Sequence, residues 1–162
     1  MKVREAMTEL PSFCRVETNL GSAAELMWNA NCGFLPVQNK KCKVVGVVTD
    51  RDMCIALGTR NRLPGDISVG EVMSGTLFAC GPADDVHTAL QTMRSAKVRR
   101  LPVIEPNGSL VGVISMDDIV SEAESAPFGK KTGISVDEVV RTFQQILHRE
   151  APQKAVKQIA AA

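Results

Sequence analysis

The 162-residue sequence lacks the features that mark several large classes of protein. It has no tyrosine, one tryptophan and only 4% aromatic residues, so few rings are available for stacking against the bases of a nucleic acid. No apolar run approaches the roughly 20 residues of a membrane-spanning helix, and the N-terminus has no apolar core like that of a signal peptide. The formal net charge is +1, which excludes binding to nucleic acid or membrane through bulk charge. We therefore expect neither membrane contact nor a nucleic-acid partner on composition.

Cysteine and histidine are too sparse and too irregularly spaced for a metal site. The number of cysteines is odd, no C-x-x-C is present, and the two histidines do not complete a zinc spacing. Free thiols in a reducing cytoplasm are the default interpretation. No nucleophile with a neighbouring base, no paired metal carboxylates and no phosphate-binding loop of the P-loop type occur. The sequence thus predicts a cytoplasmic protein that is not an enzyme, with no catalytic residue, no metal and no required cofactor.

The main regularity is an internal repeat. When the chain is shifted against itself by 66 residues, residues 7–58 align with residues 73–124 without a gap. Twelve aligned positions are identical, where average amino-acid usage would give roughly three. The clearest matches are Leu35-Pro36-Val37 with Leu101-Pro102-Val103, and Val45-Gly46-Val47 with Val111-Gly112-Val113.

Each copy carries the same order of secondary-structure signals. An apolar stretch is followed by apolar residues at helical spacing, such as Leu20, Ala23 and Met27. Two short apolar segments then flank a polar turn, which in the second copy contains the hairpin signal Pro106-Asn107-Gly108, and another helix follows. We predict a mixed α+β fold of the α/β class. Its two β-α-β-β-α repeats should pack sheet against sheet with pseudo-two-fold symmetry and share a core.

The predicted organisation has three parts: a first repeat over residues 1–64, a second over 65–125 and a helical C-terminal extension over 126–162. In the extension, Ser135 and Glu138 form a capping box, and Pro152 separates this helix from a shorter, alanine-rich one. The apolar face of the first helix must be buried, on its own repeats, on a second subunit or on an unknown target. The residues of this face are Val136, Val139, Val140, Phe143, Ile146 and Leu147.

One pattern with chemical meaning occurs in both copies: glycine, two apolar residues, serine or threonine, two variable residues and aspartate. The hydroxyl residue, Thr49 or Ser115, stands where a buried strand turns into a helix. Free backbone N–H groups and the positive end of the helix dipole suit a phosphate there. The carboxylate of Asp52 or Asp118 can accept both hydroxyls of a ribose. The same tetrapeptide is also close to a capping box, which only stabilises the helix, and one pair can serve both roles.

Basic residues near the two patterns are distributed unequally. Arg51 lies inside the first pattern, and Arg99 and Arg100 precede the Leu101 strand. At the positions of Arg99 and Arg100 the first copy has Gly33 and Phe34. If these arginines bind phosphate, they favour one of two clefts, although a solvated surface run is an equally good interpretation.

The two copies resemble a tandem pair of cystathionine-beta-synthase (CBS) domains, a Bateman module. The resemblance covers about residues 1–124, with Gly46-Val47-Val48-Thr49-Asp50-Arg51-Asp52 as a specific match and Gly112-Val113-Ile114-Ser115-Met116-Asp117-Asp118 as a good one. It implies clefts between the sheets that bind adenosine-containing ligands such as AMP, ADP, ATP or S-adenosylmethionine, and a homodimer shaped as a flat disc of four repeats. The implied contacts are ribose at Asp52 and Asp118, phosphate at Thr49 and Ser115, and base at the backbone around Leu35, Pro36, Leu101 and Pro102.

Three functions are compatible with these features. The first is a ligand-sensing regulatory module in which nucleotide binding changes a dimer or partner interface. The second is a scaffold that binds an unknown regulated protein without any nucleotide. The third, weaker function is a redox-linked module, because Cys14 and Cys80 occupy equivalent positions and could approach each other across the pseudo-axis.

Overall fold

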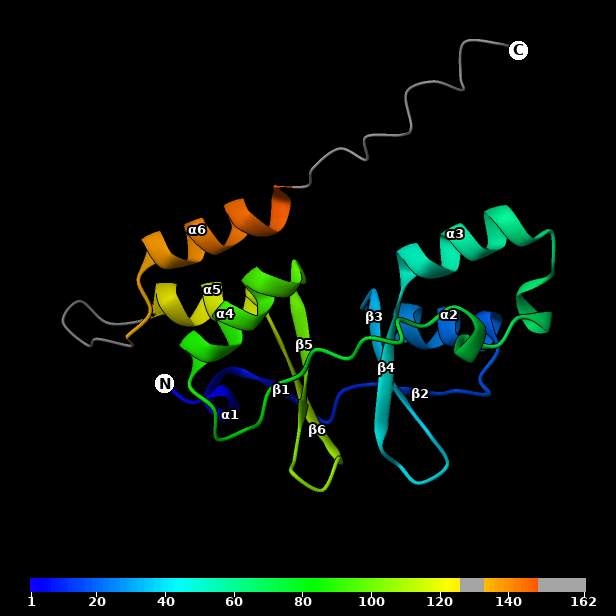
Figure 1. The fold of residues 1–162 in the computed structure, drawn as a ribbon, viewed down its shortest axis with the longest axis horizontal. Helices are drawn as coiled ribbons and strands as arrows, with labels where there is room; N and C mark the ends of the chain where they lie inside the picture. The colour runs from blue at the N-terminus through cyan, green and yellow to red at the C-terminus, as the bar shows by residue number, and fades with distance from the viewer. Residues whose placement is uncertain (126–132, 149–162) are drawn as a thin grey trace, which may run out of the picture.

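A computed structural model describes residues 1–125 and 133–148 of the chain. The predicted helix after Pro152 lies outside the described residues. Figure 1 shows two bodies side by side, each made of a small sheet flanked by helices. Among the described residues, no helix has both the length and the apolar character needed to cross a membrane.

The first body has the predicted β-α-β-β-α order. Its sheet has the strand order β2-β3-β4, with β2 parallel and β4 antiparallel to the middle strand β3. The Asn19 side chain accepts a hydrogen bond from the Ser22 backbone N–H at 2.9 Å and so caps the first helix. The elements are β2 (Cys14–Arg15), α2 (Leu20–Asn29), β3 (Phe34–Gln38), β4 (Val44–Thr49) and α3 (Asp50–Arg60).

The second body repeats this order 66 positions later. Its first strand is reduced to a single parallel bridge between Cys80 and Val103, which is equivalent to the pairing of Cys14 with Val37. Both hairpins have a register irregularity at the same place, after Val37 and after Val103. The elements are α4 (Val86–Ala96), β5 (Arg100–Ile104), β6 (Leu110–Ser115) and α5 (Met116–Ser125). The predicted fold class and pseudo-symmetry are confirmed.

The segment before each repeat completes the other repeat. The N-terminal helix α1 (Val3–Ala6) and strand β1 (Thr8–Glu9) join the second body, where β1 pairs with β6. The Val3 N–H donates to the Asp84 carbonyl at 3.0 Å. The short helices η1 (Pro64–Asp66) and η2 (Val69–Glu71) follow the first repeat, and the Val69 N–H donates to the Thr18 carbonyl at 2.7 Å.

This exchange explains the glycine at the head of each repeated pattern. A Cβ on Gly112 would lie 2.5 Å from the Met7 sulfur, and one on Gly46 would lie 2.6 Å from the Ser74 carbonyl oxygen. Ser74 bridges β4 at Val47, as Thr8 pairs with β6 at Val113. Because the crossing segment lies directly on the strand, no larger residue fits there without displacing it.

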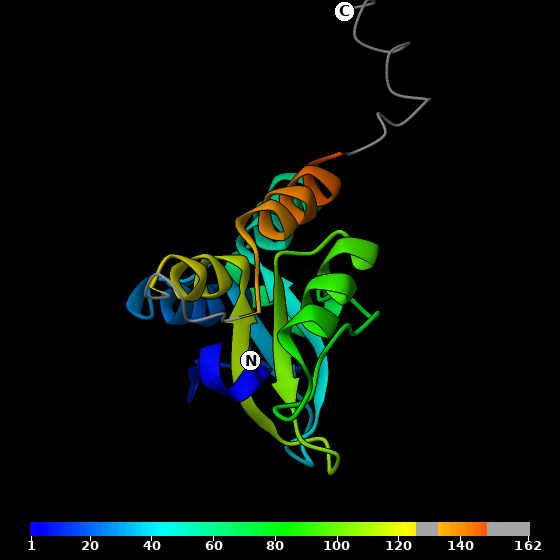
Figure 2. The same cartoon turned by 90° about the vertical axis from the view of Figure 1, so that its left-hand side faces the viewer.

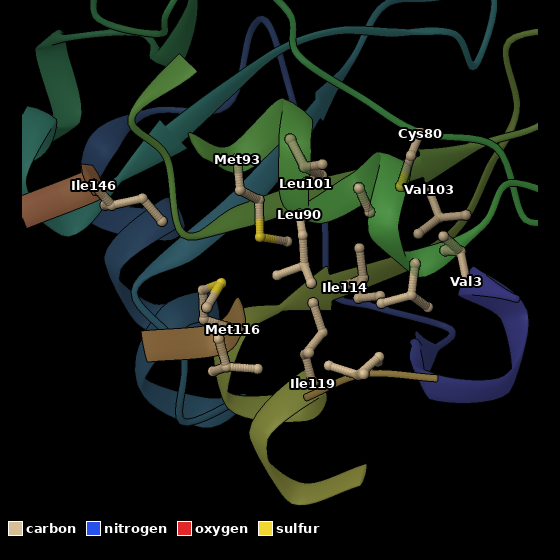
Figure 3. Packing of buried hydrophobic residues seen from close by; sticks show 14 residues of the cluster. Val3, Cys80, Leu90, Met93, Leu101, Val103, Ile114, Met116, Ile119 and Ile146 are labelled. Atoms are coloured by element: carbon tan, nitrogen blue, oxygen red, sulfur yellow. The ribbon is translucent and has the colours of Figure 1, made fainter. Parts of the chain in front are cut away.

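The buried apolar side chains form two clusters rather than the shared core that we expected. The first cluster contains Leu20, Leu35 and Ile67, and the second contains Leu90, Leu101 and Ile114. Figure 3 shows the second cluster, in which Val3 packs with residues of the hairpin and helices. In β4, residues alternate between buried and half-buried, so only one face of this strand is fully enclosed. The expectation was wrong because each sheet is sealed by its own helices.

The C-terminal helix α6 (Val136–Leu147) packs on its own chain, which was the first of the three alternatives. It lies across α4 and α5 (Figure 1, Figure 2). Val139 and Ile146 are buried, and Phe143 packs against the same cluster. The N-cap Ser135 accepts from the Glu138 N–H at 3.1 Å, which is one half of the predicted capping box. The Glu138 carboxylate binds His87 instead of returning to the Ser135 N–H.

Ile67 should be an anchor of the first body. Its side chain is fully buried, whereas Leu63, four residues earlier in the same connection, is 71% exposed. We predict that Ile67→Ala lowers the free energy of unfolding by about 2–5 kcal/mol because it leaves a cavity, while Leu63→Ala changes it by less than about 0.5 kcal/mol. Urea denaturation of both variants measures the difference, and equal midpoints would contradict the assignment.

The ion pair between His87 and Glu138 should make α6 docking pH-dependent. The two side chains are 2.9 Å apart (Nδ1 to Oε1). The hydrogen bond to Glu138 raises the pKa of His87 above 6.5, opposed by desolvation and by the N-terminal amine and supported by Asp85. A raised pKa means that the stabilisation is fully present below about pH 6.5 and is lost as the pH rises through the folded-state pKa.

We therefore expect wild type to be more stable than His87→Gln at about pH 5.5, with the gap closing towards about pH 8.5. Urea denaturation across this range measures the gap. A gap that stays constant with pH would show that the pair contributes nothing through charge.

Candidate functional site

The first repeated pattern forms a closed hydrogen-bond unit at a strand-to-helix turn. Thr49 is the last residue of β4 and the N-cap of α3. Its hydroxyl donates to Asp52 Oδ2 at 2.7 Å, its backbone N–H donates to the same oxygen at 3.0 Å, and it accepts from the Asp52 N–H at 3.2 Å. The capping-box interpretation is therefore confirmed here.

The second pattern has the same geometry. Ser115 ends β6, its hydroxyl lies 2.7 Å and its N–H 2.8 Å from Asp118 Oδ2, and the Asp118 N–H donates to Ser115 Oγ at 3.1 Å. Within the described residues, the hydrogen bonds to both aspartates end on Oδ2. Each pattern thus leaves one carboxylate oxygen, Oδ1, for a further donor, and both carboxylates are half-buried.

A small cavity lies beside Asp52. Its volume is about 200 Å³, below the roughly 300–1,000 Å³ of ordinary ligand pockets. Glu71 in its wall accepts from Arg62 at 2.7 Å, which holds the pKa of that carboxyl at about 2. The lining residues are Asp52, Ile55, Ala56, Thr59, Arg60, Glu71 and Val72.

Arg60 and Glu71 were missed by the sequence analysis. Arg60 donates to the Glu71 carbonyl at 2.9 Å and lies 3.5 Å from its carboxylate. The available signal was the pair of basic residues Arg60, at the end of α3, and Arg62, just after it. Their partner Glu71 stands on the far side of the Pro64-Gly65 turn.

The residues expected near the base are buried in the two hairpins. Leu35 and Leu101 are fully buried, and Pro36 and Pro102 pair with Val47 and Val113 of the neighbouring strands. The side chains of Leu35 and Leu101 belong to the two cores, so a contact with a ligand at these two positions would be made by the backbone.

The predicted phosphate-binding arginines do not converge on one point. Arg51 and Arg99 are exposed, and neither lines the cavity beside Asp52. Arg100 lies 3.5 Å from Asp117 Oδ2. Its side chain also lines a larger depression of the first body together with Asp50, so a residue of the second repeat reaches the turn of the first pattern.

This larger depression, the α2–α3 groove, lies between the two helices of the first repeat and was not predicted. Its volume is about 970 Å³. Most of its lining is apolar, and it holds neither Thr49 nor Asp52. The lining residues are Ala24, Met27, Trp28, Asn31, Cys32, Gly33, Asp50, Met53, Cys54, Leu57, Gly58 and Arg100.

Cys14 and Cys80 do not form the redox pair considered above. Both are free, and they belong to different hydrophobic clusters. Desolvation raises the pKa of Cys14 to about 11 and that of Cys80 to about 12. A neutral, buried thiol is a poor nucleophile, so their equivalence reflects packing at the start of each repeat.

Thiol labelling should separate four of the five cysteines into two groups. Cys42 and Cys54 are exposed, so we predict rapid reaction with a disulfide reagent at about pH 8. Cys14 and Cys80 should react only after denaturation. Mass spectrometry of labelled peptides measures each site, and fast native labelling of Cys14 or Cys80 would contradict the pKa argument.

Comparison with known proteins agrees with this architecture. The family model of the CBS domain matches residues 3–59 and 69–125. The CBS domain-containing protein YhcV of Bacillus subtilis is 32% identical over 117 residues, which cover 72% of this chain and 81% of YhcV. The chain belongs to the CBS domain family and carries two copies of the domain.

Two solved structures share the fold. The CBS domain pair of protein MJ0100, in complex with 5′-methylthioadenosine and S-adenosyl-L-methionine, has a TM-score of 0.69 at 20% identity, with 75% of this chain and 94% of that chain covered. CBSX2 in complex with AMP has a TM-score of 0.66 at 24% identity, with 76% and 96% covered.

Proposed function

We propose that the protein is a regulatory module that senses adenosine-containing nucleotides and has no catalytic activity of its own. The observation that carries the proposal is the duplicated turn, in which Thr49 with Asp52 and Ser115 with Asp118 have the same geometry. The adenosine ligands of MJ0100 and CBSX2, two proteins of the same fold, support the choice of ligand class.

The chemistry of the turn suits a nucleotide. Oδ2 of each aspartate is held by the hydroxyl and N–H of its own turn, which fixes the orientation of the carboxylate. Oδ1 is then directed to accept a ribose hydroxyl, and charged acceptors make the stronger hydrogen bonds. The hydroxyl of Thr49 or Ser115 and the start of the following helix provide donors for phosphate.

The two sites should not be equivalent. Arg51 in the first pattern is replaced by Asp117 in the second, and Arg99 and Arg100 have no basic counterparts in the first repeat. Because these arginines do not converge on one point, we propose only that the unequal charge of the two repeats gives the two clefts different affinities for phosphate. A nucleotide with differential affinity for two arrangements of the repeats would shift their populations, and a homodimer or a regulated partner protein would respond to this shift.

Calorimetric titration of the whole chain with AMP, ADP, ATP and S-adenosylmethionine tests the proposal. We expect at least one ligand to bind, and Asp52→Asn or Asp118→Asn to weaken it about tenfold or more, because a hydrogen bond to a charged acceptor is lost. The asparagine keeps the shape of the side chain and one acceptor oxygen for the capping box.

Asp85→Asn is the matched control. Asp85 also caps a helix, by accepting from the His87 N–H at 3.0 Å, but it lies outside both patterns, so its replacement should leave affinity unchanged. Absence of heat with all four ligands, or equal affinities in all three variants, would favour the nucleotide-independent scaffold instead.

A further inference from the structure

The C-terminal ends of α4 and α6 enclose a cavity that lies outside both repeated patterns. The two helices pack side by side (Figure 1, Figure 2), with His87 against Glu138 near their starts and Lys97 against His148 at their ends. The cavity between these ends, the α4–α6 pocket, has a volume of about 420 Å³. Its lining residues are Arg94, Lys97, Gln144, Gln145 and His148.

The α4–α6 pocket has an excess of positive charge. No acidic residue lines it, and neither Arg94 nor Lys97 forms an ion pair in the part of the chain that the structure describes. Each helix C-terminus carries about −0.5 of an elementary charge, so the two helix ends together offset about one of these two cations. A positive charge of about one is therefore left for an anion.

Arg94 has hydrogen-bond donors that the protein does not use. Its Nη2 donates to Thr142 Oγ1 at 3.0 Å, whereas its Nε is buried and has no hydrogen-bond partner among the described residues. A buried N–H without an acceptor is unfavourable. A guanidinium presents its N–H groups in a planar fork that matches the oxygens of an oxyanion. An oxyanion in the α4–α6 pocket would therefore provide acceptors for this side chain.

Lys97 stands at a backbone position that does not favour lysine. Its φ is 55°, and the equivalent residue of the first repeat is Asn31, with a φ of 48°. Asparagine adopts this left-handed conformation more readily than lysine does. Residues in such sparsely populated conformations gather at functional sites. The Lys97 ammonium donates to the His148 carbonyl at 3.1 Å, at the wall of the pocket, so the second repeat has a charged donor where the first has a residue that suits the backbone.

The donors of the pocket suit a phosphate group. A phosphate monoester carries about −1.5 to −2 charges near neutral pH and three strong acceptor oxygens, so it can accept from Arg94, Lys97 and the glutamine amides together. A carboxylate has one charge and two oxygens and would leave more of these donors unused. The volume of the pocket lies within the roughly 300–1,000 Å³ of ordinary ligand sites, which leaves room for a group attached to the phosphate.

We propose that the α4–α6 pocket binds a phosphate group, either free or as part of a small metabolite, and that this anion fastens the end of α6 to the end of α4. Arg94 and Lys97 belong to the end of α4, and the other lining residues to the end of α6, so a bound anion bridges the two helices. The site is independent of the nucleotide binding proposed above, because neither Asp52 nor Asp118 lines it.

NMR titration of the whole chain with orthophosphate, pyrophosphate and ribose 5-phosphate tests the site, with sodium chloride at equal ionic strength as the reference. We expect saturable shifts of the Lys97 and His148 amide signals with phosphates but not with chloride. Lys97→Asn introduces the residue of the first repeat, and Arg94→Gln keeps a donor for Thr142. Each should raise the dissociation constant about tenfold or more, because a charged donor is lost. Lys41→Asn removes the same charge from an exposed turn and is the matched control, with unchanged affinity.

The order of affinities identifies the source of the phosphate. Tighter binding of ribose 5-phosphate than of orthophosphate supports an organic phosphate, and the reverse order supports a free one. Shifts that rise linearly with phosphate or that chloride reproduces, or an unchanged dissociation constant in Lys97→Asn, overturn the proposal. Binding that occurs only in Glu150→Gln also overturns it, because the pocket would then serve a carboxylate of the chain itself. Asp52→Asn should leave the phosphate shifts unchanged, so this proposal and the nucleotide proposal can fail separately.

Discussion

Neither sheet of this protein can be completed by the residues of its own repeat. Strand β1 pairs with β6 of the second body, and Ser74 bridges β4 of the first. A single copy of about 55 residues buries too little surface to be securely stable, and each copy here depends on a short segment that precedes the other one. The reciprocal hydrogen bonds of Val3 and Val69 show that this exchange follows the pseudo-symmetry. The two bodies therefore have separate cores yet cannot separate from each other.

The exchanged segments also constrain which residues can stand at the candidate site. Gly46 and Gly112 stand where the exchanged segment lies on the strand, and three residues later each strand ends at Thr49 or Ser115. The glycine, the strand end and the capping aspartate are thus positioned by one backbone arrangement, which explains why they recur together in both copies. A residue pair that caps a helix can bind a ligand as well, because the cap occupies one carboxylate oxygen and fixes the direction of the other.

The repeat allowed much of this to be predicted from the sequence. Identical positions at a constant offset gave the order of elements, and the hydroxyl–aspartate spacing gave the capping boxes. The exchange could not be predicted, because a segment as short as Thr8–Glu9 carries no signal for the sheet that it joins. The prediction of a shared core was wrong for a related reason. The residues of β4 are apolar on both faces, so the sequence does not show that only one face is fully buried. The α2–α3 groove had one signal in the sequence: Trp28 stands at the position that corresponds to Arg94 in the second repeat. This difference becomes meaningful only when it is known that α6 packs over Arg94.

Duplication makes two equal faces, and the subsequent divergence of the copies can be followed in single residues. On the second repeat, Arg94 and Lys97 bind polar groups of α6, so this face is adapted to a cover within the chain. At the corresponding positions the first repeat has Trp28 and Asn31, which suit an apolar contact better than a charged one. Within residues 1–125 and 133–148, no helix is seen to cover the α2–α3 groove as α6 covers α4 and α5, and Arg100 of the second body contributes to the lining of this groove.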